Sequence, residues 1–166
     1  MKSILSALIF CFLLISAGQA QEKTTVAFTK QRKLPQARYG MSYASDGERA
    51  YIIGGRNSRH QNVKTIYAYD KQVDKWLNLT SSSKIEPSVY GSAFYMEGYE
   101  SILLLGGVSN TPKRVLLVNE LTSYHLKTFQ TTILGNNPIA AKRQCAAYNS
   151  DKVYIFGGST SMEKER

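Results

Sequence analysis

One polar loop holds the densest group of residues suited to binding chemistry in this 166-residue sequence. Residues 56–62 read Arg-Asn-Ser-Arg-His-Gln-Asn. The hydrogen-bond donors of Arg56, Arg59 and His60 suit a carboxylate or a sugar, while a solvated loop without a ligand remains the alternative. The loop is therefore a candidate binding site.

Catalytic and metal-binding patterns are absent from the sequence. His60 and His125 are the only histidines, neither belongs to an H-E-x-x-H pattern, and no cysteine pair is spaced to bind zinc. The glycines form neither a phosphate loop, a dinucleotide fingerprint nor a G-x-S-x-G elbow. We expect no catalytic residue, no metal and no cofactor, and a binding protein is favoured over an enzyme.

Residues 1–20 have the pattern of a secretory signal peptide, with a mainly apolar run of 12 residues from Ile4 to Ile15 and small residues before Gln21. A membrane anchor is the alternative, but the run is shorter than the roughly 20 residues that span a bilayer. We therefore expect a secreted or periplasmic protein without stable membrane insertion. Cys145 is then the single cysteine and is expected to be buried. Asn78 begins an Asn-Leu-Thr sequon and is a candidate for glycosylation, although an unmodified asparagine is equally compatible.

Composition and charge narrow the function classes. The chain is 43% hydrophobic and 20% charged, which excludes a disordered tail, a collagen-like chain and a coiled coil. Its net charge of +9 comes from basic residues scattered along the whole chain. Because no basic stripe forms and the chain is expected outside the cytoplasm, nucleic acid is not an expected partner.

A repeat of about 50 residues organises the chain. Three apolar runs end in glycine pairs that lie 52 and 51 residues apart, and a proline stands 19 residues before the first glycine of each pair. The pairs are Gly54 and Gly55, Gly106 and Gly107, and Gly157 and Gly158, and the prolines are Pro35, Pro87 and Pro138. In the first unit, residues 39–44 and 50–53 predict one hairpin, and residues 64–69 and 75–79 predict a second. Four strands per unit at this period predict an all-β propeller.

The first unit resembles the kelch motif. Gly54-Gly55 is followed by Tyr69-Asp70 and then, seven residues after the tyrosine, by Trp76, with Pro35 and Arg38 upstream. This resemblance implies kelch-type propeller blades of four antiparallel strands. We interpret Tyr69 and Trp76 as structural residues that pack between neighbouring sheets.

The repeat predicts the organisation of the chain. We expect a strand within residues 21–34, at 24–28, that would complete a closing blade, then repeat 1 at 35–86, a degenerate repeat 2 at 87–137, and the first half of repeat 3 at 138–166. In repeat 2, Tyr90 replaces Arg38 and Val118-Asn119 replaces Tyr69-Asp70, whereas Arg143 replaces Arg38 in repeat 3. These two and a half blades form an incomplete ring. A fragment of a longer propeller is favoured, with assembly from several chains or an open stack as alternatives.

The kelch resemblance implies that Arg38 and Arg143 point toward a ligand face, although an arginine that fixes the entry of a strand is the alternative. We expect a secreted kelch-repeat module that binds a protein or a glycan. The alternative is part of a carbohydrate-active kelch enzyme such as a sialic acid epimerase. An epimerase needs a general acid and a general base, and no motif places such a pair among Asp46, Glu97 and Asp151.

Overall fold

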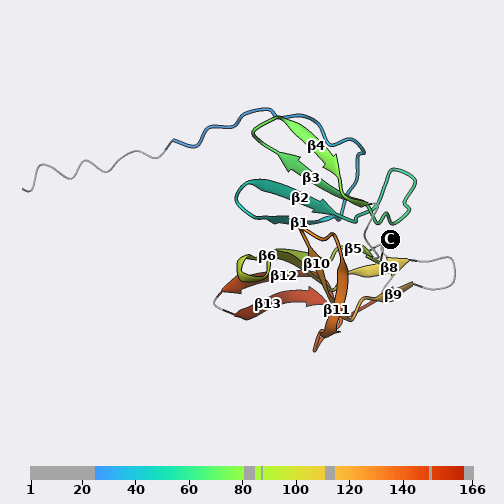
Figure 1. Cartoon of the computed structure of the whole chain (residues 1–166). Helices are drawn as coiled ribbons and strands as arrows, with labels where there is room; N and C mark the ends of the chain where they lie inside the picture. The colour runs from blue at the N-terminus through green and yellow to red at the C-terminus, as the bar shows by residue number, and fades with distance from the viewer. Residues whose placement is uncertain (1–24, 81–84, 87, 111–114, 150, 163–166) are drawn as a thin grey trace, which may run out of the picture. The chain divides into compact units, whose positions relative to one another are not determined.

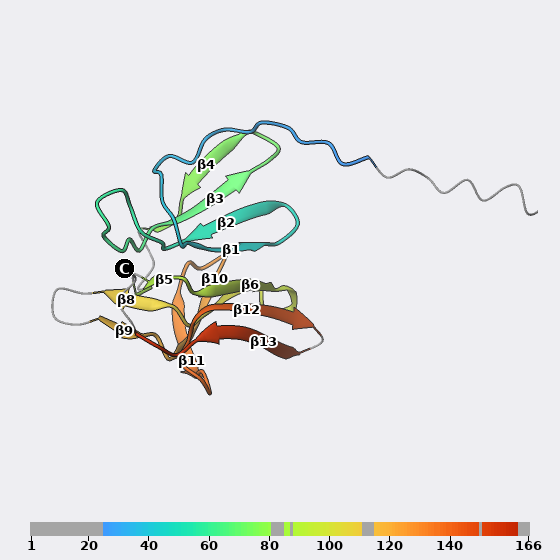
Figure 2. The same ribbon diagram turned by 180° about the vertical axis from the view of Figure 1, so that it is seen from behind.

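The computed structural model describes residues 25–80, 85–86, 88–110, 115–149 and 151–162. The chain divides into an N-terminal unit that ends at Lys30 and a second unit from Gln31 onward. Every described strand belongs to the second unit, and the figures show these strands from two sides (Figures 1 and 2). The expected signal peptide lies outside the described residues.

The first sheet contains β1 (Ser42–Ser45), β2 (Arg49–Ile53), β3 (Ile66–Asp70) and β4 (Lys75–Asn78) in the order β1-β2-β3-β4. All neighbours are antiparallel. The β1–β2 turn forms because the Asp46 carboxylate accepts hydrogen bonds from the amides of Glu48 (2.9 Å) and Arg49 (2.6 Å). Both predicted hairpins are therefore present.

The second sheet has the order β11-β10-β7-β6. Its strands are β6 (Ser92–Met96), β7 (Ser101–Leu105), β10 (Glu120–His125) and β11 (Thr131–Asn136), and the short 3₁₀ helix η2 (Glu97–Tyr99) joins β6 to β7. A bulge between Leu121 and Thr122 shifts the pairing of β10 with β11. Repeat 2 therefore keeps four strands although its motif residues have diverged.

The third sheet is the hairpin of β12 (Lys142–Asn149) and β13 (Lys152–Ser159). A further sheet contains β5 (Ser88–Val89), β8 (Val108–Asn110) and β9 (Val115–Leu117) in the order β5-β8-β9. The sheets do not close into a ring. The predicted fold class is confirmed, because two antiparallel four-stranded sheets and a hairpin follow one another as blades of a partial propeller.

Two apolar layers hold neighbouring sheets together. The layer between the first and second sheets contains Ala44, Tyr51, Ile53, Ile66, Ala68, Ile85, Ile102 and Tyr124. The layer between the second and third sheets contains Phe94, Met96, Leu103 and Leu105, with Leu121, Ala146 and Tyr148 packed against it. Burial of apolar surface in these layers is the main stabilising contribution.

Main-chain hydrogen bonds also join consecutive sheets in a repeated pattern. The Gly55 amide donates to Ser88 O (2.9 Å), and the Gly107 amide donates to Ala141 O (2.8 Å). A second series runs from the Tyr90 amide to Gly40 O (2.7 Å) and from the Arg143 amide to Tyr90 O (2.8 Å). Gly40, Tyr90 and Arg143 all have positive φ, at 61°, 63° and 58°. We call this series the backbone ladder.

The pairing register corrects the alignment of the repeats. Residues Ser42, Ser92 and Cys145 each pair with the residue before a glycine pair, so Gly40, Tyr90 and Arg143 are equivalent positions. The expectation that Arg143 and Tyr90 replace Arg38 is therefore wrong, and Ala141 and Ser88 hold that place. Tyr90 was misaligned because the β6–β7 hairpin is two residues longer than the β1–β2 hairpin. Arg143 was misaligned because the β12–β13 hairpin has the same spacing as the β1–β2 hairpin and is not shorter.

Tyr124 is the equivalent of Tyr69. Tyr69 pairs with Ala50 and Trp76, and Tyr124 pairs with Ile102 and Thr131 at the same places in the second sheet. The expectation that Val118-Asn119 replaces Tyr69-Asp70 is therefore wrong. The loop that follows Gly106 and Gly107 is longer than its counterpart in the first repeat and contains β8 and β9, which moves the tyrosine along the sequence.

Two further expectations concern the N-terminal segment and Cys145. Residues 25–28 form no strand and no described strand pairs with them. The closing blade that we expect them to complete needs partner strands from further blades, so this role stays a prediction. Cys145 is exposed rather than buried. Its neighbours Gln144 and Ala146 face the second sheet, so the alternation of a strand turns Cys145 to the opposite face of β12, which no described strand covers.

Two buried tyrosines predict a loss of stability in alkali. Burial raises the pKa of Tyr124 to about 12, and burial together with the hydrogen bond to Asp46 (2.7 Å) raises the pKa of Tyr51. A raised folded-state pKa gives stability that is fully present below the unfolded value of about 10 and is lost as pH rises through the folded value. We expect Tm to fall between pH 10 and pH 12, and Tyr51→Phe to reduce this fall. An equal fall in both proteins would contradict the assignment to Tyr51.

Candidate functional site

The candidate binding residues lie at one end of the sheets. We call the end where β2, β7 and β13 reach their glycine pairs the glycine end, and the end with the β1–β2, β3–β4, β6–β7, β10–β11 and β12–β13 turns the turn end. Loop 56–62 follows β2, and Arg143 lies near the start of β12. The strand register therefore places both at the glycine end.

Loop 56–62 folds around the side chain of Asn57. The Asn57 carboxamide oxygen accepts hydrogen bonds from the amides of Arg59 and Gln61, both at 3.0 Å. The Asn57 amide donates to Gln61 O, and the His60 amide donates to Asn57 O, again at 3.0 Å. These bonds fix the loop backbone, so Arg59 is presented from a preorganised turn.

Arg56 and Asn62 connect this loop to the second repeat. The Arg56 Nε donates to the Asn62 side-chain oxygen (3.1 Å), and the Asn62 side-chain nitrogen donates to Val108 O (2.9 Å). Arg56 also forms backbone bridges to Tyr39 and Asn62. Loop 56–62 is thus held against β8, the strand that follows the second glycine pair.

His60 contacts an aromatic side chain that the sequence did not single out. The Tyr39 hydroxyl and His60 Nδ1 lie 2.9 Å apart, and the two rings meet edge to face with centroids at 6.2 Å. His60 is exposed and has a positive φ of 58°. No sequence pattern pairs these residues, because their contact depends on the fold of the loop.

Arg38 is turned into the first sheet rather than toward a ligand. Its Nη1 donates to Gly54 O (3.1 Å) and to the carbonyl and hydroxyl oxygens of Thr65, and its guanidinium lies 4.9 Å from the centroid of the Tyr67 ring. Burial lowers the pKa of Arg38, while Tyr67 opposes that shift. The geometry therefore favours the alternative interpretation, an arginine that fixes the sheet at its glycine pair.

Arg143 lies apart from loop 56–62. Its guanidinium stands over the Tyr90 ring at 4.8 Å from the centroid, and the residue is exposed. Arg143 belongs to β12 of the third sheet, whereas Arg56, Arg59 and His60 belong to the loop that follows β2. The structure therefore groups three of the five candidates in one loop and leaves Arg38 and Arg143 as separate features.

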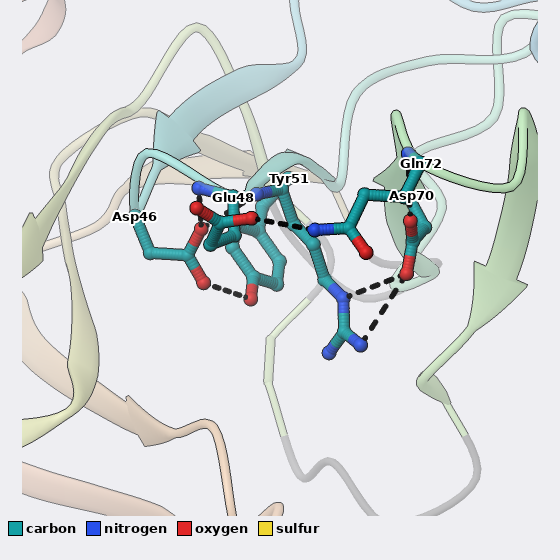
Figure 3. Close-up of polar contacts among 6 residues, drawn as sticks. Asp46, Glu48, Tyr51, Asp70 and Gln72 are labelled. Carbon is teal, nitrogen blue, oxygen red and sulfur yellow. Dashed lines mark hydrogen bonds and ion pairs between the residues drawn. The ribbon is translucent and has the colours of Figure 1, made fainter.

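Acidic residues concentrate at the turn end, where they meet basic partners. The described ion pairs are Arg49–Asp70 (3.5 Å), Arg32–Asp74 (3.5 Å) and Lys127–Glu100 (2.6 Å), and each acid belongs to a turn. Figure 3 shows two further contacts at this end, between Asp46 and the Tyr51 hydroxyl and between Glu48 and Gln72. Hydrogen bonds from the Arg49 amide and the Tyr51 hydroxyl outweigh burial and lower the pKa of Asp46.

At the glycine end the balance of charge is opposite, because the basic residues of loop 56–62 lack acidic partners among the described residues. Arg56 and Arg59 have no acidic partner among the described residues, and Lys64 is exposed beside them in the chain. The described carboxylates at this end are Glu86 and Glu120. An uncompensated positive charge on a fixed loop can attract and hold an anionic group.

The inner strands enclose only a small space. A cavity of about 110 Å³ is lined by three equivalent triplets, residues 41–43 at the start of β1, 91–93 at the start of β6, and 144–146 within β12. This volume is well below the roughly 300 Å³ at which pockets for metabolites or drugs begin. The cavity therefore fits a binding site for a small-molecule substrate poorly.

Three other expectations concern modification, metals and membranes. Asn78 is exposed at the end of β4, and its side-chain oxygen accepts a hydrogen bond from the Thr80 amide (3.0 Å). Among the described residues, no group of three histidine, cysteine or acidic side chains is placed to hold a metal ion. Within the same residues, no helix has the length and apolar character needed to cross a bilayer.

Comparisons with known proteins identify the repeat. The family model described as the KLHDC2/KLHL20/DRC7 Kelch-repeats domain matches residues 12–165. Kelch domain-containing protein 10 of Xenopus laevis is 25% identical over 139 residues, covering 80% of this chain and 33% of that protein. A kelch repeat-containing protein of Dictyostelium discoideum is 30% identical over 151 residues, covering 76% of this chain and 22% of that protein. The chain thus spans a third or less of these relatives.

A solved structure agrees with the fold. The structure of YjhT superposes with a TM-score of 0.69 at 17% identity, covering 86% of this chain and 49% of YjhT. At this identity the likeness concerns the fold alone. Together with the glycine pairs, the four-stranded sheets and the matched family model, it leads to one conclusion: the chain belongs to the kelch-repeat family.

Proposed function

We propose that this chain is a protein-interaction module that binds a carboxylate-bearing segment of its partner at the glycine end. The observation that carries the proposal is the fixed loop 56–62, in which Arg56 and Arg59 lack acidic partners among the described residues. The described ion pairs all lie at the turn end, so positive charge is left uncompensated at the glycine end.

The shape of the site favours a protein over a small substrate. Loop 56–62 adjoins strand β8 through the Asn62–Val108 hydrogen bond, and the exposed residues here belong to the loop and to Asn110. Such a surface suits an extended peptide better than an enclosed metabolite. Membership of the kelch-repeat family also supports protein binding. A secreted or periplasmic location, which the sequence of residues 1–20 suggests, is part of the same proposal.

The enzyme alternative has weaker support. Asp46, Glu97 and Asp151 occupy the β1–β2, β6–β7 and β12–β13 turns of three different sheets. The lowered pKa of Asp46 favours an ionised, turn-stabilising carboxylate rather than a general acid. A glycan partner stays a hypothesis without a specific observation in its favour.

Peptide selection tests the proposal directly. Random peptides displayed on phage are selected against the folded chain, and an enriched peptide is then measured by fluorescence anisotropy. We expect Arg56→Ala with Arg59→Ala to weaken binding at least about tenfold, because each charge-assisted pair with a carboxylate contributes roughly 1 kcal/mol or more. Lys75→Ala at the turn end is the matched control and is expected to leave affinity unchanged.

Hydrogen exchange places the bound peptide on the protein. Protection of residues 56–62 and 108–110 is expected on binding. No enrichment of any peptide, protection confined to the turn end, or equal effects of the arginine and lysine variants would each overturn the proposal. Enriched peptides without carboxylates that protect the same loops would retain the binding face but reject the proposed charge chemistry.

A further inference from the structure

Neighbouring sheets in this chain pack by one repeated rule. The first sheet presents Ala44, Tyr51 and Ile53 to the second, and the second presents Phe94, Leu103 and Leu105 to the third. We call this the forward face of a sheet. The opposite, backward face of the second sheet packs on the first through Ala93 and Leu104, and that of the third packs on the second through Ala146 and Tyr148.

The forward face of the third sheet has no partner among the described residues. Tyr154 is 46% exposed, although its equivalents Tyr51 and Leu103 are 2% and 3% exposed. Phe156 is 60% exposed, although its equivalents Ile53 and Leu105 are 4% and 2% exposed. The pairings Cys145–Phe156 and Ala147–Tyr154 add two small side chains to the same face. This surface has the chemistry of a buried blade face.

The backward face of the first sheet is exposed in the same way. Tyr43 is 75% exposed, whereas its equivalents Ala93 and Ala146 pack against the preceding sheet. Tyr69 packs at a tilt against Trp76 with ring centroids at 5.1 Å and is only half-buried, but its equivalent Tyr124 is completely buried between two sheets. Bonds from the Tyr69 hydroxyl to Gln31 and from Trp76 Nε1 to Arg32 O place a short segment on this face, but no described sheet covers it. This face therefore also matches a blade interface whose other sheet is not among the described residues.

The main-chain hydrogen-bonding groups at the two exposed faces are also complementary, as the backbone ladder shows. The ladder begins at Gly40, whose amide has no acceptor among the described residues, and its last described member is Arg143. Inside the chain, the second glycine of a pair donates its amide to a carbonyl oxygen that precedes the following sheet, as Gly55 does to Ser88 and Gly107 does to Ala141. By the same rule, the Gly158 amide would donate to the Arg38 carbonyl, and the Gly40 amide would donate to the Arg143 carbonyl, of an adjoining molecule.

We propose that the forward face of the third sheet binds the backward face of the first sheet in a second copy of this chain. The argument is continuity with the two interfaces inside the chain, which have the same register, apolar composition and main-chain donors. Counting the first, second and third sheets of each chain, two copies supply six blade sheets, four of them four-stranded and two of them hairpins. Six lies within the four to eight blades of propellers, whereas the three of one copy and the nine of three copies do not. The assembly is a head-to-tail dimer with two identical contacts.

Sedimentation of the full chain tests the dimer. We expect a discrete dimer at micromolar concentration, and Phe156→Asp or Tyr43→Asp is expected to raise its dissociation constant at least 100-fold, because each buries a charge in an apolar layer. Tyr99→Asp, at an exposed site in η2 outside both faces, is the matched control and is expected to leave the dimer intact.

Mixing the variants distinguishes this contact from any other dimer. The Phe156→Asp variant keeps its backward face, and the Tyr43→Asp variant keeps its forward face, so an equimolar mixture is expected to form a one-to-one complex. A contact between like faces would give no such rescue. A monomer at every concentration, non-specific aggregation, or a dimer insensitive to both substitutions would overturn the proposal. Such a result would indicate that these faces pack against further propeller blades instead.

A small substitution gives an independent check. An added Cβ would lie 2.7 Å from Ser88 O at Gly54 and 2.5 Å from Ala141 O at Gly106, but would meet nothing within 4 Å at Gly157. In the dimer, the equivalent carbonyl is that of Arg38 in the second copy. Gly157→Ala is therefore expected to weaken the dimer at least tenfold while the chain stays folded, and an unchanged dissociation constant would overturn the proposed register.

Discussion

Replacing Gly107 by alanine is expected to lower the free energy of unfolding by about 3 kcal/mol, because strain and a steric clash add together. Gly107 has φ of +93°, which side-chain-bearing residues rarely adopt. An added Cβ would lie 2.8 Å from both the Gly91 nitrogen and Val89 O. Both are main-chain atoms, Val89 at the end of β5 and Gly91 just before β6, so the backbone itself must shift. Urea denaturation monitored by tryptophan fluorescence measures the loss.

Gly47→Ala separates strain from the clash. Gly47 has nearly the same φ, +90°, but an added Cβ would meet nothing within 4 Å. Its cost is expected to be about 1–2 kcal/mol, the cost of left-handed backbone alone. Equal losses for the two substitutions would show that close approach of the strands at Gly107 contributes nothing.

Truncation of Tyr124 to alanine is expected to cost about 4 kcal/mol, because it opens a cavity between the first two sheets. The side chain is fully buried, and its hydroxyl donates to Leu79 O at 3.1 Å, which ties the end of the first sheet to the second. Tyr124→Phe removes the hydroxyl and leaves the ring, so it is expected to cost about 1 kcal/mol. Thermal and urea unfolding of both variants measure the difference.

Tyr69→Ala is the matched comparison for the ring. Tyr69 has the equivalent position in the first sheet but remains half-buried. At protein concentrations below self-association, we expect its loss to be clearly smaller than that of Tyr124→Ala. If Tyr124→Phe cost as much as Tyr124→Ala, the hydroxyl rather than the packing of the ring would hold the sheets together.

Much of the blade structure was predictable because its determinants are local. Each determinant involves residues close together in the sequence. They are the alternating burial along β2 and β3, the glycine pairs, and the turn residues such as Asp46 and Asp70. These signals identified both hairpins of the first sheet. Four strands in the second sheet followed from repetition, even though the tyrosine and tryptophan of the first repeat were no longer recognisable at the expected places.

The alignment of repeats failed where insertions changed the spacing. The interval from the glycine pair to the motif tyrosine is longer in the second repeat, because β8 and β9 lie within it. Hydrogen-bond register, which the sequence does not display, shows that Tyr124 replaces Tyr69 and that Arg143 corresponds to Gly40. The distance from the proline agrees with this register in the third repeat but fails in the second, where the hairpin is longer.

The candidate site was only partly predictable for a similar reason. Composition identified loop 56–62, but the Asn57-centred turn and the Tyr39–His60 contact depend on the folded backbone. For Arg38, the sequence left two interpretations open. The kelch resemblance implied a ligand-facing arginine, and an arginine that fixes the entry of a strand was the alternative. The hydrogen bonds to Gly54 O and Thr65 O favour the alternative.

The backbone ladder has a consequence for how such repeats diverge during evolution. Glycine, tyrosine and arginine occupy its three positions, yet the same main-chain bonds form at each step. The angle between neighbouring sheets is thus encoded without a requirement for matched side chains. A gene segment for one repeat can be duplicated or exchanged and still dock on its neighbours, while the side chains at these positions evolve independently.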